Sequence, residues 1–408
     1  MRNLLYTILT FCTLCTLCAC GKLSILDFSL GTKSLVMYAG QTTQIKVGIS
    51  YAGADTVELH FTSADETVAM VDNKGNVTAV EQGNTVITVS CEDRSLECEV
   101  TVTPQVCVVG YSMSSGGVCE AFQYFDNTYS SFASGMSARP YSVIFNGEKK
   151  IICGEGKKAT NTEENAEPWR AMYWTDGKAT TLDNSEFAST AYGITMAGDS
   201  LLVVGVKNDA EGNINAYLWT PKTTVCLGND AIASSVKADG NTIYIGGTLN
   251  DSPTLWINGT PNTYPGVGEI NNIEVVDGFV YAVGTSLFNG VACATLWTDG
   301  VATIISETAS EGIDLSVYRG TVSVCGSVGN RGFVWDAASG ISIPDNSGAG
   351  NTFTGIEAGK NGVMLSGYTA IYDIQSSALN HYAILWQQEP ITIAPTGTSS
   401  YATAIVAR

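Results

Sequence analysis

Two short apolar runs, Leu202-Val203-Val204-Gly205 and Ala216-Tyr217-Leu218-Trp219, recur along most of the 408-residue chain. The runs that end in glycine close at Gly110, Gly154, Gly205, Gly246, Gly284, Gly326 and Gly367. The runs that end in tryptophan close at Trp174, Trp219, Trp256, Trp297, Trp335 and Trp386. Self-similarity with a period of about 40 residues indicates a repeat architecture.

Each repeat has the pattern of four short strands, which in the third repeat we expect at residues 191–197, 201–206, 216–220 and 223–227. Hairpin signals such as Thr298-Asp299-Gly300 follow several of the tryptophans. Four strands in this period are typical of a β-propeller blade. Seven glycines therefore predict seven four-stranded blades within residues 105–408. The repeat resembles kelch-like and related bacterial propellers in architecture. The double-glycine kelch signature, however, is not present in every blade.

The first repeat lacks two features of the others, the tryptophan and the inner strand. It offers Tyr124 or Phe125 where the others have tryptophan, and it lacks an inner strand before Val106. The C-terminal run 400–407 resembles the inner strand at 190–197. We therefore expect the end of the chain to complete the first blade and close the ring, which leaves few unpaired strand edges.

A smaller β module is expected at residues 26–103. Alternating runs such as Gln44-Ile45-Lys46-Val47-Gly48-Ile49 are typical of strands with one buried face. The segment from Phe61 to Val80, continued through Gly83 to Val89, closely resembles the second family of bacterial immunoglobulin-like domains. Phe61 stands where that family usually has tryptophan. The resemblance implies a β-sandwich that acts as a spacer or an adhesion module, with the spacer role favoured.

The amino terminus has the features of an export signal. A single arginine precedes an apolar run, residues 4–17, that is too short to span a bilayer. Leu17-Cys18-Ala19-Cys20-Gly21 resembles a bacterial lipobox, which implies a signal peptide at 1–19, a lipid on Cys20 and a tether at 20–25. An ordinary secretory signal cut elsewhere is the alternative.

This arrangement resembles lipoproteins of gut Bacteroidetes and implies the outer membrane. The residues after Cys20 lack the acidic cluster that often marks surface-exported members of that group, so a surface or a periplasmic position stays open.

Composition limits the possible functions. Hydrophobic residues make up 45% of the chain and charged residues only 14%, with 43 glycines, which favours an all-β protein. A net charge of −19 repels phosphate backbones, so nucleic acid is not an expected partner. Nucleophile-elbow and zinc-binding motifs do not occur, and only two histidines are present. We therefore assign no catalytic residue, metal or cofactor.

Export places the cysteines in an oxidising compartment. A hairpin centred on Arg94-Ser95 would set Cys91 opposite Cys98, so the sequence predicts an optional disulfide between them. Six further cysteines lie in apolar strand-like runs and are expected to be small buried side chains: Cys107, Cys119, Cys153, Cys226, Cys293 and Cys325.

One rim of the propeller is the expected binding face. It collects the loops between the second and third strands of each blade and the loops that lead into the next blade. The loops at 155–170 and 368–382 are long, whereas 327–331 is a short turn, and such variation on a constant scaffold often carries function. Seven residues of the long loops are candidate ligand-binding residues: Glu163, Glu164, Glu167, Trp169, Tyr372, Asp373 and His381.

Aromatic rings with nearby carboxylates and amides suit sugar recognition. We therefore expect a lipid-anchored cell-envelope protein whose propeller rim recognises a glycan or a protein. One alternative is a polysaccharide-active hydrolase or lyase that uses rim carboxylates, because such chemistry needs only two suitably spaced carboxyl groups. Another alternative is a structural subunit of an envelope complex.

Overall fold

The computed structural model describes residues 24–52, 57–114, 116–159, 167–344, 350–373, 378–395 and 398–408. In these ranges the chain forms strands, turns and loops without any helix. The described residues therefore contain no helix with the length and apolar character needed to span a bilayer. The chain divides into two compact units, with the boundary between Thr103 and Pro104. The prediction of an all-β protein is confirmed.

The first unit is built from three small sheets, ordered β1-β4, β3-β7-β6 and β2-β9-β8-β5. Its strands are β1 Ser24–Leu30, β2 Ser34–Tyr38, β3 Thr42–Gln44, β4 Val47–Ala52, β5 His60–Ser63, β6 Ala69–Val71, β7 Asn76–Ala79, β8 Gly83–Cys91 and β9 Arg94–Thr103. Their inward-facing residues, among them Val77, Ile87 and Val100, form one core. Phe61 packs against that core, as expected for the residue in the tryptophan position.

Gly75 is required by the turn between β6 and β7. Its φ of +78° is unfavourable for other residues, and a Cβ there would come within 2.8 Å of the Phe61 ring. The Asp72 carboxylate accepts the backbone N–H groups of Lys74 and Asn76, both at 2.8 Å, and so holds the turn closed.

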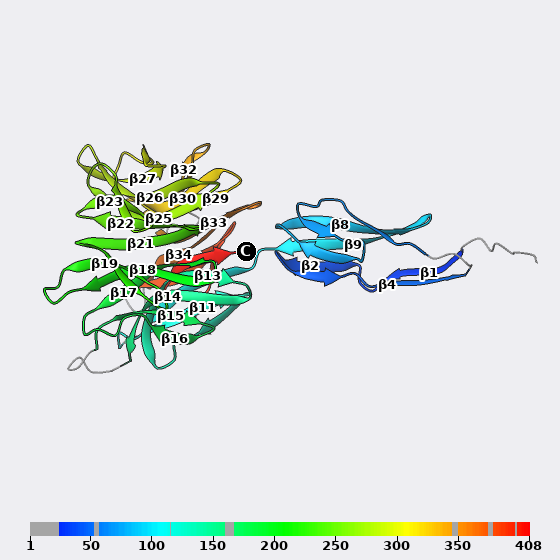
Figure 1. Cartoon of the computed structure of the whole chain (residues 1–408), viewed down its shortest axis with the longest axis horizontal. Coiled ribbons are helices and arrows are strands. Elements are labelled where there is room, and N and C mark those ends of the chain that lie inside the picture. The colour runs from blue at the N-terminus through cyan, green and yellow to red at the C-terminus, as the bar shows by residue number, and fades with distance from the viewer. Residues whose placement is uncertain are drawn as a thin grey trace, which may run out of the picture. The chain divides into compact units, whose positions relative to one another are not determined.

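The second unit is a ring of seven four-stranded sheets (Figure 1). The strands of the first blade are β37 Ser399–Ala407, β10 Val106–Met113, β11 Cys119–Phe125 and β12 Thr128–Ser131. Those of the second to fourth blades are β13 Met136–Asn146, β14 Lys149–Lys158, β15 Arg170–Thr175, β16 Lys178–Thr181, β17 Ser189–Ala197, β18 Ser200–Asn208, β19 Ile214–Trp219, β20 Thr224–Asn229, β21 Ala231–Asp239, β22 Thr242–Leu249, β23 Ser252–Ile257 and β24 Thr260–Thr263.

The fifth to seventh blades follow the same order from the inner strand outward. Their strands are β25 Gly268–Val276, β26 Phe279–Phe288, β27 Val291–Thr298, β28 Val301–Ile304, β29 Ser310–Tyr318, β30 Thr321–Val328, β31 Arg331–Asp336, β32 Gly340–Ser342, β33 Asn351–Gly359, β34 Gly362–Asp373, β35 Ala378–Trp386 and β36 Pro390–Thr392. The prediction of seven four-stranded blades is confirmed.

The C-terminal strand β37 closes the ring as predicted. It is the inner strand of the first blade and pairs antiparallel with β10 along its length, from Val106 opposite Ala407 to Met113 opposite Ser399. In Figure 1 this strand, in red, lies inside the propeller. Val108 pairs with Tyr124 in the same way that Val203 pairs with Trp219, so Tyr124 rather than Phe125 takes the tryptophan position of the first blade.

The recurring glycines lie opposite the bulge in the inner strand of each blade, where a Cβ would clash with the backbone. A Cβ on Gly205 would lie 1.9 Å from the carbonyl oxygen of Thr190, just before the bulge of β17. In the fourth blade the equivalent residue is Gly247, whose Cβ would lie 1.9 Å from the carbonyl oxygen of Ile232. The apolar run that ends at Gly246 predicted Gly246 at this position, which is wrong by one residue because two glycines are adjacent there.

The tryptophans pack between neighbouring blades, as expected from their spacing. Trp219 of β19 belongs to a core shared with Ile151 and Cys153 of the preceding blade, and Trp256 packs with Val204 in the next interface. A packed apolar layer between adjacent sheets stabilises the ring without a single central core.

The cysteines depart from expectation at two places. The β8–β9 turn falls at Glu92-Asp93, so Cys91 pairs with Arg94 and Cys98 pairs with Ile87, and both thiols are free. At about 3.3 Å per strand residue the two cysteines are too far apart for a disulfide. The predicted Cys91–Cys98 pairing is therefore wrong, because the hairpin is centred two residues earlier. Cys226 is exposed, whereas the other five propeller cysteines are buried as expected.

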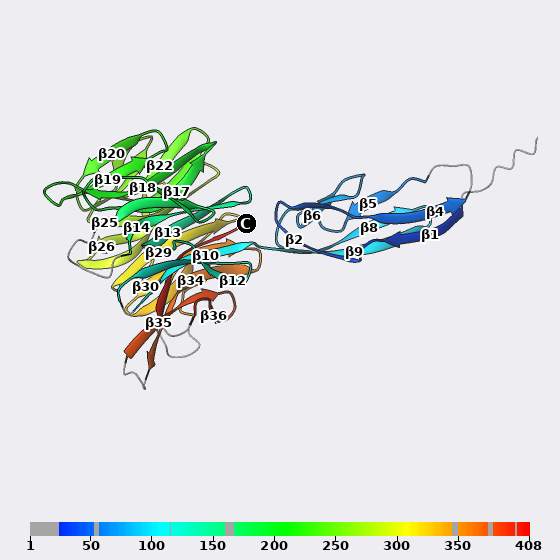
Figure 2. The same ribbon diagram turned by 90° about the horizontal axis from the view of Figure 1, so that it is seen from below.

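One loop at the predicted binding rim is shorter than the sequence predicted. The turn between β30 and β31 is short, as expected. The segment 368–382 is not a long loop, because β34 and β35 continue through most of it and Asp373 still pairs with Ala378. Figure 2 shows the far ends of these two strands projecting beyond the rest of the propeller.

Candidate functional site

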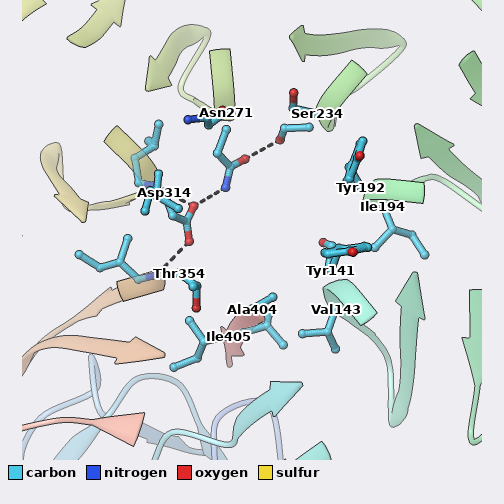
Figure 3. A pocket seen from close by; sticks show the side chains of 18 of the residues that line it. Tyr141, Val143, Tyr192, Ile194, Ser234, Asn271, Asp314, Thr354, Ala404 and Ile405 are labelled. Atoms are coloured by element: carbon cyan, nitrogen blue, oxygen red, sulfur yellow. Dashed lines mark hydrogen bonds between the residues drawn. The ribbon is translucent and has the colours of Figure 1, made fainter. Parts of the chain in front are cut away.

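A central channel runs between the seven inner strands and encloses a cavity of about 210 Å³. Each inner strand contributes the residue that its bulge leaves unpaired, and all seven line this cavity: Tyr141, Tyr192, Ser234, Asn271, Ile313, Thr354 and Thr403. A bulge redirects a side chain away from the alternating faces of a strand. Figure 3 shows five of them around the channel: Tyr141, Tyr192, Ser234, Asn271 and Thr354.

A chain of hydrogen bonds links the inner strands of four blades across the channel wall (Figure 3). Ser235 donates to the Asn272 side chain, whose amide donates to the Asp314 carboxylate. The second carboxylate oxygen of Asp314 accepts the backbone N–H of Ile356 at 2.9 Å. Burial raises the pKa of Asp314 to about 6. These groups satisfy one another, so they stabilise the ring rather than offer free ligands.

Three more titratable residues line the channel beyond this network. Lys237 and Glu274 form an ion pair, and Glu357 lies on the wall beside them. Burial, and then the charge of Asp314, raise the pKa of Glu357 to about 8. The carboxyl group of Glu357 is therefore mostly protonated at neutral pH.

The rim at which the inner strands begin, here called the N-rim, carries a buried carboxylate close to the channel. Glu155 of β14 accepts hydrogen bonds from Arg139 Nη1 at 3.2 Å, from the Tyr141 hydroxyl at 3.2 Å and from Thr190 Oγ1 at 2.7 Å. Burial, and then the nearby Glu155 charge, raise the pKa of Tyr141 above its usual range. Glu155 therefore joins Arg139 to Tyr141 of the channel, and the Tyr141 ring packs edge-on against that of Tyr192.

Planar side chains extend from Arg139 along the N-rim. The Arg139 guanidinium lies 5.7 Å from the centre of the Tyr111 ring, and Tyr111 stacks on Tyr401 with 5.2 Å between ring centres. Tyr401 in turn stacks on His381, and its hydroxyl lies 3.2 Å from His381 Nδ1. Tyr368 packs edge-on against both Tyr401 and His381.

On its other side Arg139 contacts Trp169, whose ring centre is 4.5 Å from the guanidinium carbon. The Lys157 ammonium lies 4.9 Å from the same ring centre. Cation–π contacts of this kind are strongest with tryptophan. Together these residues form what we call the rim cluster: Tyr111, Arg139, Lys157, Trp169, Tyr368, His381 and Tyr401. All of them are half-buried, and they come from the seventh, first and second blades.

Of the four predicted ligand-binding residues whose side chains the structure describes, two belong to this cluster, Trp169 and His381. Tyr372 is 60% exposed near the tip of the β34–β35 hairpin, and Glu167 is exposed just before β15. Asp373 ends β34, and its side chain lies outside the described part of the structure, as do Glu163 and Glu164.

The remaining members of the cluster were not predicted. Arg139 and Tyr401 occupy equivalent positions of two inner strands, one residue before the residues that pair with Gly154 and Gly110. Nothing in the local sequence marks them as members of a site. Tyr111 and Tyr368 directly follow the recurring glycines Gly110 and Gly367, and this shared position was the available signal.

The described residues contain no group of three or more histidine, cysteine, aspartate or glutamate side chains arranged to hold a metal ion. Among the rim carboxylates that the structure describes, Glu155 already accepts three hydrogen bonds. The arrangement of the rim cluster therefore suits binding through aromatic, cationic and hydroxyl groups.

Comparison with known families identifies the first unit. Residues 27–102 match the model of the bacterial Ig-like domain (group 2), so the first unit carries such a domain. None of the curated proteins compared with the chain matches it. The whole chain thus combines a bacterial Ig-like domain with a seven-bladed β-propeller.

Several solved structures resemble the chain at low sequence identity. A quinonprotein alcohol dehydrogenase-like protein from Bacteroides thetaiotaomicron is 10% identical with a TM-score of 0.41, over 94% of this chain and 98% of that chain. The β-propeller domain of the Trilobed protease from Pyrococcus furiosus is 12% identical with a TM-score of 0.41, over 65% and 85%. TolB from Acinetobacter baumannii is 11% identical with a TM-score of 0.41, over 71% and 81%. These likenesses concern the fold alone.

Proposed function

We propose that this protein is a lipid-anchored cell-envelope binding protein whose propeller recognises a glycan at the rim cluster. The observation that carries the proposal is the row of half-buried aromatic side chains on the N-rim, which adjoins the channel mouth through Glu155 and Tyr141. Sugars present rows of hydroxyl groups, which the polar tips and the edges of these aromatic side chains can contact.

The anchoring part of the proposal rests on the lipobox-like segment that ends at Cys20-Gly21, which lies outside the described residues. A lipid on Cys20 would hold the protein at a membrane, and the Ig-like domain would act as a spacer. Labelling with a radioactive fatty acid, compared between the natural chain and Cys20→Ala, tests the anchor. Protease treatment of intact cells then separates surface from periplasmic placement, because only a surface-exposed propeller is digested without lysis.

Binding is tested by a thermal-shift screen of the purified protein against plant, host and microbial glycans, followed by calorimetry on each positive. A ligand at one hundred times its Kd should raise the free energy of unfolding by about 2.7 kcal/mol. Trp169→Ala should weaken binding about tenfold, or roughly 1.4 kcal/mol. Phe279→Ala is the matched control, because Phe279 is 51% exposed at the β25–β26 turn on the opposite rim.

Equal losses in both variants would contradict recognition at the rim cluster. The absence of any bound glycan would contradict the proposed function, and a stoichiometric protein partner in a gentle membrane extraction would then identify the protein as a subunit of an envelope complex.

A further inference from the structure

The rim cluster presents hydrogen-bond donors for which the described residues supply no acceptor. Arg139 uses Nη1 for Glu155 and Nε for the Cys119 sulfur, while its Nη2 has no partner among the described residues. The Lys157 ammonium contacts the Trp169 ring and pairs with no carboxylate in the described part of the chain. The Tyr111 and Tyr368 hydroxyls likewise have no hydrogen-bond partner within the described residues.

The faces of the aromatic rings are already largely used within the cluster. Tyr401 lies between Tyr111 and His381, with an interplanar angle of 29° to each. A ligand on the N-rim therefore meets ring edges and hydroxyls rather than open faces. Ring edges are the electropositive part of an aromatic side chain, and phenol hydroxyls donate hydrogen bonds.

The charge on the N-rim is unevenly distributed around the ring. Arg139 precedes the bulge in the inner strand of the second blade, and the equivalent residues of the fifth and sixth blades are Glu269 and Glu311. Burial, and then the charge of Glu269, raise the pKa of Glu311, as expected for two carboxylates close together. Among the described residues, positive charge on this rim thus lies at the second blade, where Arg139 pairs with Glu155 and Lys157 pairs with no carboxylate.

We propose that the glycan bound at the rim cluster is an acidic polysaccharide, and that Lys157 and the free edge of Arg139 bind its carboxylate groups. Hydrogen bonds between a guanidinium or ammonium group and a carboxylate are shorter and stronger than neutral ones. The tyrosine hydroxyls would contact the neighbouring sugar oxygens. This inference rests on the proposed glycan-binding function and names the class of glycan.

The test compares acidic oligosaccharides with counterparts in which each carboxyl group has been reduced to an alcohol. The probes are oligogalacturonides, oligoalginates and hyaluronan oligosaccharides, each titrated calorimetrically into the full-length protein. Carboxyl reduction should weaken binding at least about tenfold, and added salt should weaken binding of the acidic form alone. Both forms keep the same sugar backbone, so the comparison isolates the charge.

Lys157→Gln should weaken binding of the acidic form about threefold to tenfold. Lys158→Gln is the matched control, because Lys158 is exposed and its side chain leaves β14 on the other face. A thermal melt of each variant shows that the fold is retained. Similar effects of the two substitutions would overturn the inference.

Equal binding of reduced and natural oligosaccharides, or binding of neutral glycans only, would overturn the acidic class while the glycan-binding function stands. Failure of every acidic and neutral glycan to bind would overturn the proposed function together with this inference.

Discussion

Val108 of β10 and Ile405 of β37 pair within one sheet, although β10 is the first strand of the propeller in sequence and β37 is the last. The first blade is therefore assembled from both ends of the propeller chain. Thr403 of β37 adds hydrogen bonds to the carbonyl oxygens of Val109 at 3.2 Å and Pro140 at 2.7 Å, so the last strand also joins the first blade to the second.

Deletion of residues 399–408 should open the ring. The deletion exposes one edge of β10 and removes Ala402 and Ile405 from the core of the first blade. We expect loss of the cooperative thermal transition of the propeller and association of the chains through the free strand edge. Calorimetry and size-exclusion chromatography measure these effects. A synthetic peptide of residues 399–408 should restore the transition when it is added, and an unchanged transition without the peptide would contradict this role of β37.

Substitution of Gly247 should be more damaging than substitution of its neighbour Gly246. A Cβ at residue 247 would lie 1.9 Å from a backbone oxygen, whereas a Cβ at residue 246 would lie 2.7 Å and 2.8 Å from the Cγ2 methyl groups of Ile273 and Ile270, which are side-chain atoms. Gly246→Ala should cost about 1–3 kcal/mol of stability, and Gly247→Ala should cost more. Urea unfolding of the two variants measures the difference, and the reverse order would show that Gly246 faces the bulge.

Removal of the Glu155 carboxylate should destabilise the N-rim. Glu155→Ala leaves the donors on Arg139, Tyr141 and Thr190 without their acceptor, which should cost roughly 2–4 kcal/mol. The control is Glu148→Ala, because Glu148 pairs with Arg408 while its side chain is 85% exposed, and its loss should cost less than about 1 kcal/mol. Comparable losses of stability in the two variants by urea unfolding would contradict the importance of burial at Glu155.

The channel glutamate Glu357 should make stability depend on pH. Its pKa is about 8 in the folded protein against an ordinary value of 4.5, so the folded state favours the protonated carboxyl group. The stabilisation is complete below about pH 4.5 and is lost as the pH rises through 8. Its magnitude is roughly 2–4 kcal/mol after allowance for partial exposure to the channel.

Glu357→Gln keeps a neutral side chain of similar size and should remove this loss. We expect the variant to be more stable than the natural protein at pH 9 and similar to it at pH 5, as measured by urea unfolding at each pH. Glu307→Gln, which changes an exposed glutamate, should leave the pH profile unchanged. A parallel profile for Glu357→Gln and the natural protein would show that Glu357 is ionised in the folded state near neutrality.

Much of the fold could be predicted from short-range patterns. The spacing of glycines and tryptophans predicted seven blades because each blade repeats the same two requirements, a residue without Cβ beside the bulge and a large side chain between sheets. The hairpin at Cys91 and Cys98 was predicted incorrectly because alternation of side chains does not determine which residues form the turn.

The site depended on contacts that no local pattern contains. Sequence alone determined the all-β class, the blade repeat, the closing strand and the presence of aromatic side chains in loops of one rim, since these follow from period, turn chemistry and side-chain size. Only the tertiary structure decided that Trp169 and His381 belong to one cluster with Arg139, Tyr111 and Tyr401, because ring closure brings together residues from the seventh, first and second blades. Distances between strands from opposite ends of a chain are set by the packing of the whole ring.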